Sequence, residues 1–145
     1  MNHIDGNLLI PVYVTAKGFK RIIQKQLKQL DLTFTQFIVL RILDQSPDLY
    51  VKEIGKQLAL DSGTLTPVLK KLEEKGYVLR TPSVRDARDL LVQITPEGHQ
   101  LILQSEKLRQ DLAGKIEINE EKVRRLNDLL TEFAAIMQEI TCEEI

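Results

Sequence analysis

Residues 51–80, VKEIGKQLALDSGTLTPVLKKLEEKGYVLR, contain two short helical patterns joined by a tight turn. In the first pattern, Val51–Leu58, apolar residues lie four apart and so share one face of a helix. Asp61-Ser62-Gly63 supplies turn and cap residues, and apolar residues then recur at helical spacing up to Gly76. Glycine is typical of the position just after a helix end. The stretch therefore predicts a helix-turn-helix.

The second helix of such a unit enters the major groove of DNA, so its polar residues are candidate contacts. Hydroxyl groups at its N-terminal end can meet base edges and phosphates, and lysines a turn later can reach a flanking phosphate. Pro67 would clash with the carbonyl of Gly63 if Gly63 were helical, so the start stays open between Ser62 and Thr64. Each residue alone equally fits a helix cap or a solvated face. The candidate contacts are Ser62, Thr64, Thr66, Lys70 and Lys71.

A β-hairpin follows the second helix. Tyr77–Thr81 and Leu90–Thr95 are short β-rich runs separated by the polar loop Pro82–Asp89. Within the loop, Asp86 precedes Arg88 by two residues and can orient its guanidinium toward the narrow minor groove. Charged hairpin tips without a function are also common. The hairpin completes a winged helix-turn-helix, and its candidate DNA contacts are Arg85, Asp86 and Arg88.

Two further helices are predicted before this unit. From Leu8 to Leu30, apolar residues recur at three, four or seven positions, which indicates a long first helix with Pro11 in its first turn. Thr33 and Gln36 have the spacing of a capping box, which predicts a helix over Phe34–Gln45.

The helix over residues 34–45 is expected to stop at Ser46-Pro47-Asp48. After the hairpin, Thr95-Pro96-Glu97 begins another helix and Asn119 caps the last one. The apolar stripe of the last helix is too wide for one small core to bury, so we expect it to form a dimer interface with the first helix. The candidate interface residues are Leu8, Val12, Leu126, Leu130, Phe133, Met137 and Ile140.

The composition suits one compact domain, since the chain has 145 residues and 43% of them are hydrophobic. The net charge of −1 restricts any nucleic-acid contact to a local surface. Residues 1–50 and 51–95 each carry a net charge of +2, whereas residues 96–145 carry −5. The acidic last third is therefore not expected to face phosphates.

Nothing in the sequence predicts a membrane span or a secretory leader. The apolar run Leu8 to Val14 is too short to cross a bilayer and contains Pro11, and no charged leader or cleavage site accompanies it. The single cysteine, Cys142, allows no internal disulfide and fits a reducing compartment. We expect a cytoplasmic protein.

The helix-turn-helix, RDARD (85–89) and LLVQITPEGH (90–99) resemble the MarR family of bacterial regulators, and the helix layout on both sides is similar as well. LDSGTLTPVLKKLE (60–73) is most similar to the organic-hydroperoxide-resistance regulators and their staphylococcal redox-sensing relatives. The resemblance implies a mainly α fold with a small hairpin wing. It also implies an intertwined homodimer that binds a near-palindrome, usually as a repressor released by a ligand or by oxidation.

Applied to this chain, the resemblance implies one domain over residues 1–145. Residues 33–95 would form the DNA-binding lobe, and residues 1–32 and 96–145 the dimerisation helices. The implied partners are double-stranded DNA and a second copy of the chain. The residues that the resemblance assigns to DNA are Ser62, Thr64, Thr66, Lys70, Lys71, Asp86 and Arg88.

One departure concerns sensing. The peroxide-sensing branch has a reactive cysteine where this chain has Leu9 in LLIPVY (8–13), and tyrosines where it has Ile23 and Phe34. We therefore expect an apolar pocket for a small lipophilic or phenolic effector, oriented by the hydroxyl of Tyr13, or else simple core packing. A thiol sensor using Cys142 is the alternative, although no adjacent basic residue would lower its pKa. The pocket residues are Leu9, Tyr13, Ile23, Phe34 and Phe37.

Other function classes lack a motif. No phosphate-binding glycine loop or nucleophile motif is present, so we expect neither an enzyme nor a cofactor. His3 and His99 lie in no metal-ligand spacing, His99 is expected at the surface, and Glu73-Glu74 is expected on a solvated face. A winged helix that serves as a protein-interaction scaffold remains the alternative, although exposed threonines and Arg88 favour DNA.

Overall fold

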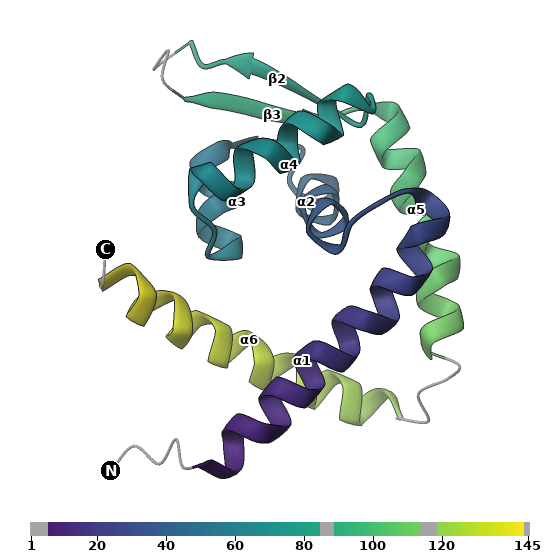
Figure 1. The fold of residues 1–145 in the computed structure, drawn as a ribbon, viewed down its shortest axis with the longest axis vertical. Helices are drawn as coiled ribbons and strands as arrows, with labels where there is room; N and C mark the ends of the chain where they lie inside the picture. The colour runs from purple at the N-terminus through teal and green to yellow at the C-terminus, as the bar shows by residue number, and fades with distance from the viewer. Residues whose placement is uncertain (1–5, 85–88, 114–118, 144–145) are drawn as a thin grey trace.

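The computed structural model describes residues 6–84, 89–113 and 119–143. It is mainly helical with one small sheet, as expected (Figure 1). The elements in chain order are α1 (Gly6–Leu27), the 3-10 helix η1 (Lys28–Leu30), α2 (Phe34–Gln45), β1 (Asp48–Tyr50), α3 (Val51–Leu58), α4 (Ser62–Glu74), β2 (Val78–Pro82), β3 (Leu90–Ile94), α5 (Pro96–Ala113) and α6 (Glu120–Glu143).

The predicted helix-turn-helix is confirmed as α3 and α4. The carboxylate of Asp61 caps α4 by accepting a hydrogen bond from the backbone N–H of Thr64 at 2.8 Å, so the helix starts at Ser62. At the other end, Gly76 has a φ of 75° and donates to the carbonyl of Glu73. A left-handed glycine is the expected terminator there, because it has no Cβ to clash.

The wing belongs to a three-stranded antiparallel sheet with strand order β1-β3-β2. Strands β2 and β3 match the predicted hairpin, with Val78 opposite Ile94 and Pro82 opposite Leu90. Strand β1 was not predicted, because Ser46-Pro47-Asp48 indicated only a helix stop. A strand of three residues is too short to show an alternation of apolar and polar side chains. It forms because β3, more than 40 residues later, provides its hydrogen-bonding partner.

The first helix differs at both ends from the prediction. It begins at Gly6, which makes Pro11 its sixth residue rather than a first-turn residue. It ends at Leu27, because the chain tightens into η1 and then turns at Asp31, whose φ is 51°. The capping box at the start of α2 is confirmed, since Thr33 and Gln36 each bond the other's backbone N–H.

The buried core lies inside the winged unit, under α2, α3 and α4 and against the sheet. α1 contributes Leu27 to it and packs Ile23 against it, and α5 adds Leu101 and Ile102. The fully buried side chains are Leu27, Val39, Leu40, Leu43, Ile54, Leu65, Leu69, Leu72, Val78, Val92 and Ile102.

The junction between the wing and α5 is tightly packed. Thr95 Oγ1 donates to the carbonyl of Gly76 at 2.7 Å and accepts from the backbone N–H of Gly98 at 3.1 Å. A Cβ at Gly98 would lie 2.4 Å from the carbonyl oxygen of Tyr77. The first turn of α5 can therefore sit against the sheet only with glycine at position 98.

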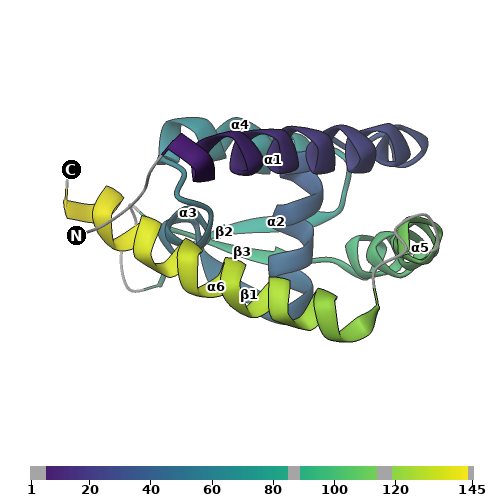
Figure 2. The same ribbon diagram turned by 90° about the horizontal axis from the view of Figure 1, so that it is seen from below.

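The long helices α1 and α6 lie apart from this core. Figure 2 shows them along opposite faces of the molecule, with α2 between them. None of the described side chains of α6 is buried, and α1 contributes Leu27 alone. Among the residues that the structure describes, no helix is long and apolar enough to cross a membrane.

Candidate nucleic-acid interface

One face of α4 is fully open to solvent. Its opposite face holds Leu65, Leu69 and Leu72 in the core, which fixes the rotation of the helix about its axis. The predicted contact residues on α4 all lie on the exposed part, and they are Ser62, Thr64, Thr66, Lys70 and Lys71. Burial of the leucines thus presents the polar side chains outward as a group.

The threonine hydroxyls of α4 already donate their hydrogens within the helix. Thr64 Oγ1 donates to Asp61 Oδ2 at 2.8 Å, and Thr66 Oγ1 donates to the carbonyl of Ser62 at 2.6 Å. Because its hydrogen is already used, each hydroxyl oxygen can only accept a hydrogen bond from a bound molecule. These bonds to Thr64 also lower the pKa of the Asp61 carboxyl, so the cap is charged at neutral pH.

The two lysines of α4 differ in their surroundings. Lys70 Nζ lies 4.0 Å from Glu74 Oε1, one helical turn later. Lys71 has no ion pair with any described residue, and it lines a polar hollow beside η1. Lys71 is therefore the better placed of the two for binding an anion.

A contact that the sequence analysis missed joins α4 to the wing. Arg80 on β2 pairs with Glu73 at 2.6 Å, and the Arg80 side chain is only 18% exposed. The expectation that Glu73-Glu74 is a solvated face is therefore wrong for Glu73. A carboxylate at the end of a helix and an arginine two residues into the next strand are the signal that would have predicted the pair.

The predicted wing contacts Arg85, Asp86 and Arg88 lie outside the described residues. The adjacent part of the wing is described up to Val84, whose side chain is fully exposed.

Most of the predicted interface residues on α1 and α6 are exposed. Phe133 and Met137 are half-buried, and the other five are between 39% and 54% exposed. Those five are Leu8, Val12, Leu126, Leu130 and Ile140.

An apolar cavity of about 240 Å³ lies between α1, α2 and α5. It brings together Ile23, Phe34 and Phe37 of the predicted pocket. Leu9 and Tyr13 do not line it and are more than 60% exposed, so their placement in the same pocket was wrong. The reason is distance along the helix, because ten residues separate Tyr13 from Ile23 and correspond to about 15 Å.

The polar groups of the cavity come from α2, from α5 and, through Gln26, from α1. Arg41 Nη1 lies 3.4 Å from Glu106 Oε1 at its edge, and Ser105 Oγ donates to the carbonyl of Ile102 at 2.6 Å. The full lining is Phe19, Ile23, Gln26, Leu27, Phe34, Phe37, Ile38, Arg41, Ser105 and Glu106.

His99 lies at the surface, as expected, but it is paired with an acidic residue. Its Nδ1 lies 2.7 Å from Asp44 Oδ1, which joins the start of α5 to the end of α2. Within the described part of the chain, no group of three or more His, Cys, Asp or Glu side chains is placed to hold a metal ion.

Comparisons with known proteins identify the family. The MarR family model matches residues 32–90. The HTH-type transcriptional regulator SarZ of Staphylococcus epidermidis is 33% identical over 132 residues, which cover 91% of this chain and 89% of SarZ.

Solved structures agree over nearly the whole chain. Reduced AbfR bound to DNA, a protein of Staphylococcus epidermidis, is 28% identical with a TM-score of 0.76, covering 92% of both chains. A cysteine-to-serine mutant of MarR from Escherichia coli, complexed with operator DNA, is 29% identical with a TM-score of 0.78. This match covers 88% of the present chain and 94% of the MarR chain. On the winged helix-turn-helix, the family model and the identity to SarZ, the chain belongs to the MarR family.

Proposed function

We propose that the protein is a transcriptional regulator, a repressor, that binds duplex DNA through α4 and the wing. The proposal is carried by the exposed N-terminal half of α4. There Thr64 and Thr66 are exposed to solvent, while the leucines of the same helix are buried in the core. Two relatives of the same fold have been crystallised with DNA, AbfR and MarR. α4 is called the recognition helix below.

The proposal divides the contacts by chemistry. Ser62, Thr64 and Thr66 meet base edges, because they lie where the recognition helix begins. Lys70 and Lys71 follow one to two turns later and meet phosphates. In the wing, Arg85, Asp86 and Arg88 are assigned to the minor groove on sequence grounds.

Footprinting of the purified protein on genomic DNA tests the proposal. The expected result is a small set of protected sites, each a near-palindrome with half-sites about 10 base pairs apart. Protection without sequence preference would mean that the protein binds duplex DNA of any sequence, which would contradict a sequence-specific regulator. The absence of any protection would favour a protein-interaction scaffold and contradict the proposal.

We further propose that the functional unit is a homodimer built by α1 and α6, with residues 33–95 as the DNA-binding lobe of each chain. A 24-residue helix of which no described side chain is buried, and only Phe133, Met137 and Gln138 are half-buried, gains little stability from packing within one chain. Contiguous exposed apolar surface of this kind is typical of an interface. A second copy offers the same surface and would bury both.

Release from DNA is proposed to follow an effector rather than a thiol. The cavity of about 240 Å³ is larger than the roughly 150 Å³ that suffices for benzene, so it admits one substituted ring. Ser105 Oγ can accept from a phenolic hydroxyl, the role first expected of Tyr13. An occupant would also lie beside the Arg41–Glu106 pair, which joins the DNA-binding lobe to α5.

The nearer branch within the family is proposed to be that of the organic-hydroperoxide regulators, without their thiol chemistry. The relative AbfR has been crystallised in reduced, overoxidised and disulfide forms. The resemblance to that branch places Leu9 where its members have the reactive cysteine, and Cys142 is the one cysteine of this chain.

Titration of cumene hydroperoxide into the DNA complex distinguishes the two modes of release. We expect wild type and Cys142→Ser to stay bound alike, while a phenol raises the melting temperature of both. Release by peroxide in wild type, lost in Cys142→Ser, would make Cys142 the sensor and contradict the effector proposal.

A further inference from the structure

A lysine-lined hollow flanks the recognition helix on the side away from the wing. It has a volume of about 410 Å³ and lies between η1, the start of α2 and the end of α4. Its charged lining consists of Lys28, Lys71, Lys75 and Asp31. Three lysines and one aspartate leave an excess of two positive charges.

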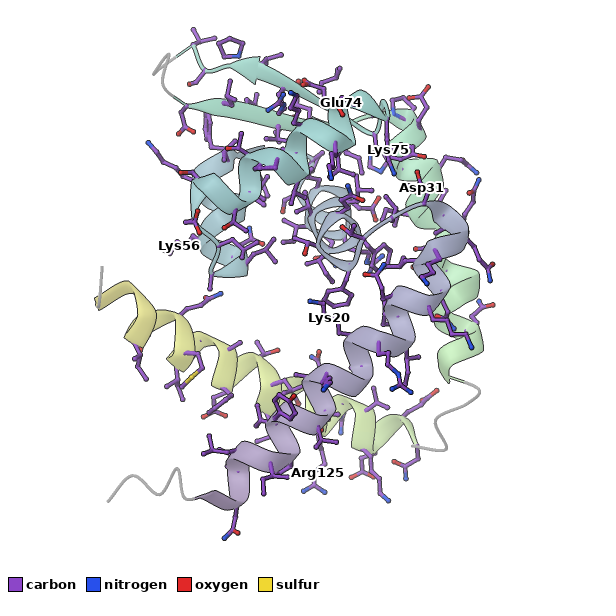
Figure 3. The ribbon with its side chains drawn as sticks, viewed as in Figure 1. Lys20, Asp31, Lys56, Glu74, Lys75 and Arg125 are labelled. Atoms are coloured by element: carbon purple, nitrogen blue, oxygen red, sulfur yellow. The ribbon has the colours of Figure 1, made fainter. Side chains whose placement is uncertain are left out.

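The charges in the hollow are not equally available. Lys75 Nζ lies 2.7 Å from Asp31 Oδ2 and also donates to the carbonyl of Asp31. Figure 3 shows the two residues next to each other, one after the end of α4 and the other between α1 and α2. Lys28 and Lys71 are exposed and pair with no acidic group in the described part of the chain. Lys75 therefore connects the end of α4 to the turn after η1, and Lys28 and Lys71 supply the uncompensated positive charge of the hollow.

The hollow and the wing lie on opposite sides of the recognition helix. Residues two apart on a helix point about 200° apart, so Lys71 faces the hollow while Glu73 faces Arg80 of the wing. Lys71 also follows Thr64 by seven residues, which keeps both on one edge of the helix about 10 Å apart. A B-DNA major groove is about 12 Å wide. A helix lying in it has one phosphate backbone on each side.

We propose that the hollow formed by Lys28, Lys71 and Lys75 binds a DNA backbone phosphate. This phosphate lies on the side of the major groove away from the wing. The inference rests on the proposed DNA binding. It adds two lysines to the DNA contact surface: Lys28, from outside the helix-turn-helix and the wing, and Lys75, which caps the end of α4. Both sides of the groove are then held, one by the wing and the other by the hollow.

The salt dependence of DNA binding tests the inference. Each neutralised phosphate adds about 0.9 to the slope of log K against log salt, whatever the base sequence. We expect Lys28→Ala with Lys71→Ala to lower the slope by about 0.9, the contribution of the one phosphate that the hollow binds, on a specific and on a scrambled duplex. Lys122→Ala, an exposed lysine on α6, is the matched control and should leave the slope unchanged.

The outcomes separate this inference from the function on which it rests. A wild-type protein that binds duplex DNA and a double variant with an unchanged slope would overturn the inference alone. Failure of the wild type to bind any duplex would overturn both. Inorganic pyrophosphate is the second probe. If it protects the lysines from acetylation but the double variant keeps the wild-type slope, the hollow binds small anions and the DNA inference is wrong.

Discussion

Arg80 on β2 holds the carboxylate of Glu73 on α4 with two side-chain hydrogen bonds, from Nε at 2.9 Å and from Nη2 at 2.6 Å. The backbone N–H of Arg80 donates to the other carboxylate oxygen at 3.1 Å. Three bonds between two residues fix the recognition helix relative to the first strand of the wing. The two elements proposed to contact DNA are therefore joined directly at this point.

The first prediction concerns the pH dependence of that pair. The hydrogen bonds from the Arg80 side chain hold the pKa of the Glu73 carboxyl below its ordinary value of 4.5. A lowered pKa in the folded state stabilises the protein above the ordinary value, and this stability is lost as the pH falls through the folded-state pKa. Glu73→Gln should cost about 1 kcal/mol of unfolding free energy near pH 7, since solvent screens a partly exposed pair.

Urea denaturation of wild type and Glu73→Gln near pH 7 and near pH 3 measures this difference. We expect the gap between the two proteins to shrink at the lower pH. An equal gap at both values would mean that the Glu73 charge contributes nothing.

The second prediction concerns the Thr66 hydroxyl. Because it donates to the carbonyl of Ser62, it can accept from an exocyclic amine of adenine or cytosine. Thr66→Val keeps the shape of the side chain and removes the acceptor. It should weaken binding to a specific site about tenfold and leave a scrambled duplex unaffected.

Thr131→Val is the matched control for Thr66→Val. The Thr131 hydroxyl makes the same type of bond, to the carbonyl of Asn127 at 2.8 Å, on α6. An equal loss of specific affinity in both variants would mean that the loss comes from lower helix stability. It would contradict a base contact by Thr66.

The third prediction concerns the close approach of α5 to the sheet. A methyl group at position 98 would lie 2.4 Å from the carbonyl oxygen of Tyr77 and 2.7 Å from Ile94 Cγ1. Gly98→Ala should therefore destabilise the protein by about 2 kcal/mol in urea denaturation. Glu97→Ala, one residue earlier and exposed, should change stability by less than about 0.5 kcal/mol. Similar small effects of both changes would contradict the packing at this junction.

The fourth prediction concerns assembly. Replacing Leu130 and Phe133 on α6 with aspartate places charges in the proposed apolar interface, where their desolvation opposes association. Light scattering should report the mass of one chain instead of two. Leu79→Asp is the control, since Leu79 on β2 is 54% exposed, as is Leu130. A double variant that stays dimeric would move the interface away from α6.

Local sequence patterns predicted the parts of the fold that form by local interactions. The capping box of Thr33 and Gln36 and the left-handed Gly76 are decided within a few residues, so spacing alone indicated them. Strand β1 and the His99–Asp44 pair depend on residues 45 and 55 positions apart, for which one sequence provides no signal.

The candidate site was predicted in part for the same reason. The exposed face of the recognition helix follows from helical periodicity. The hollow of Lys28, Lys71 and Lys75 does not, because it needs η1 beside the end of α4. The pocket was misjudged at Tyr13, since periodicity places residues on a face but ignores their distance along the helix.

Competition between two duplexes of equal length tests the central claim most directly. One duplex carries a site protected in the genomic footprinting, and the other carries the same bases in scrambled order. A dimeric regulator should bind the first duplex at least about a thousandfold more tightly than the second, with two chains per site. Equal affinity for both duplexes, or no binding to either, would contradict the claim that this chain is a sequence-specific DNA-binding regulator.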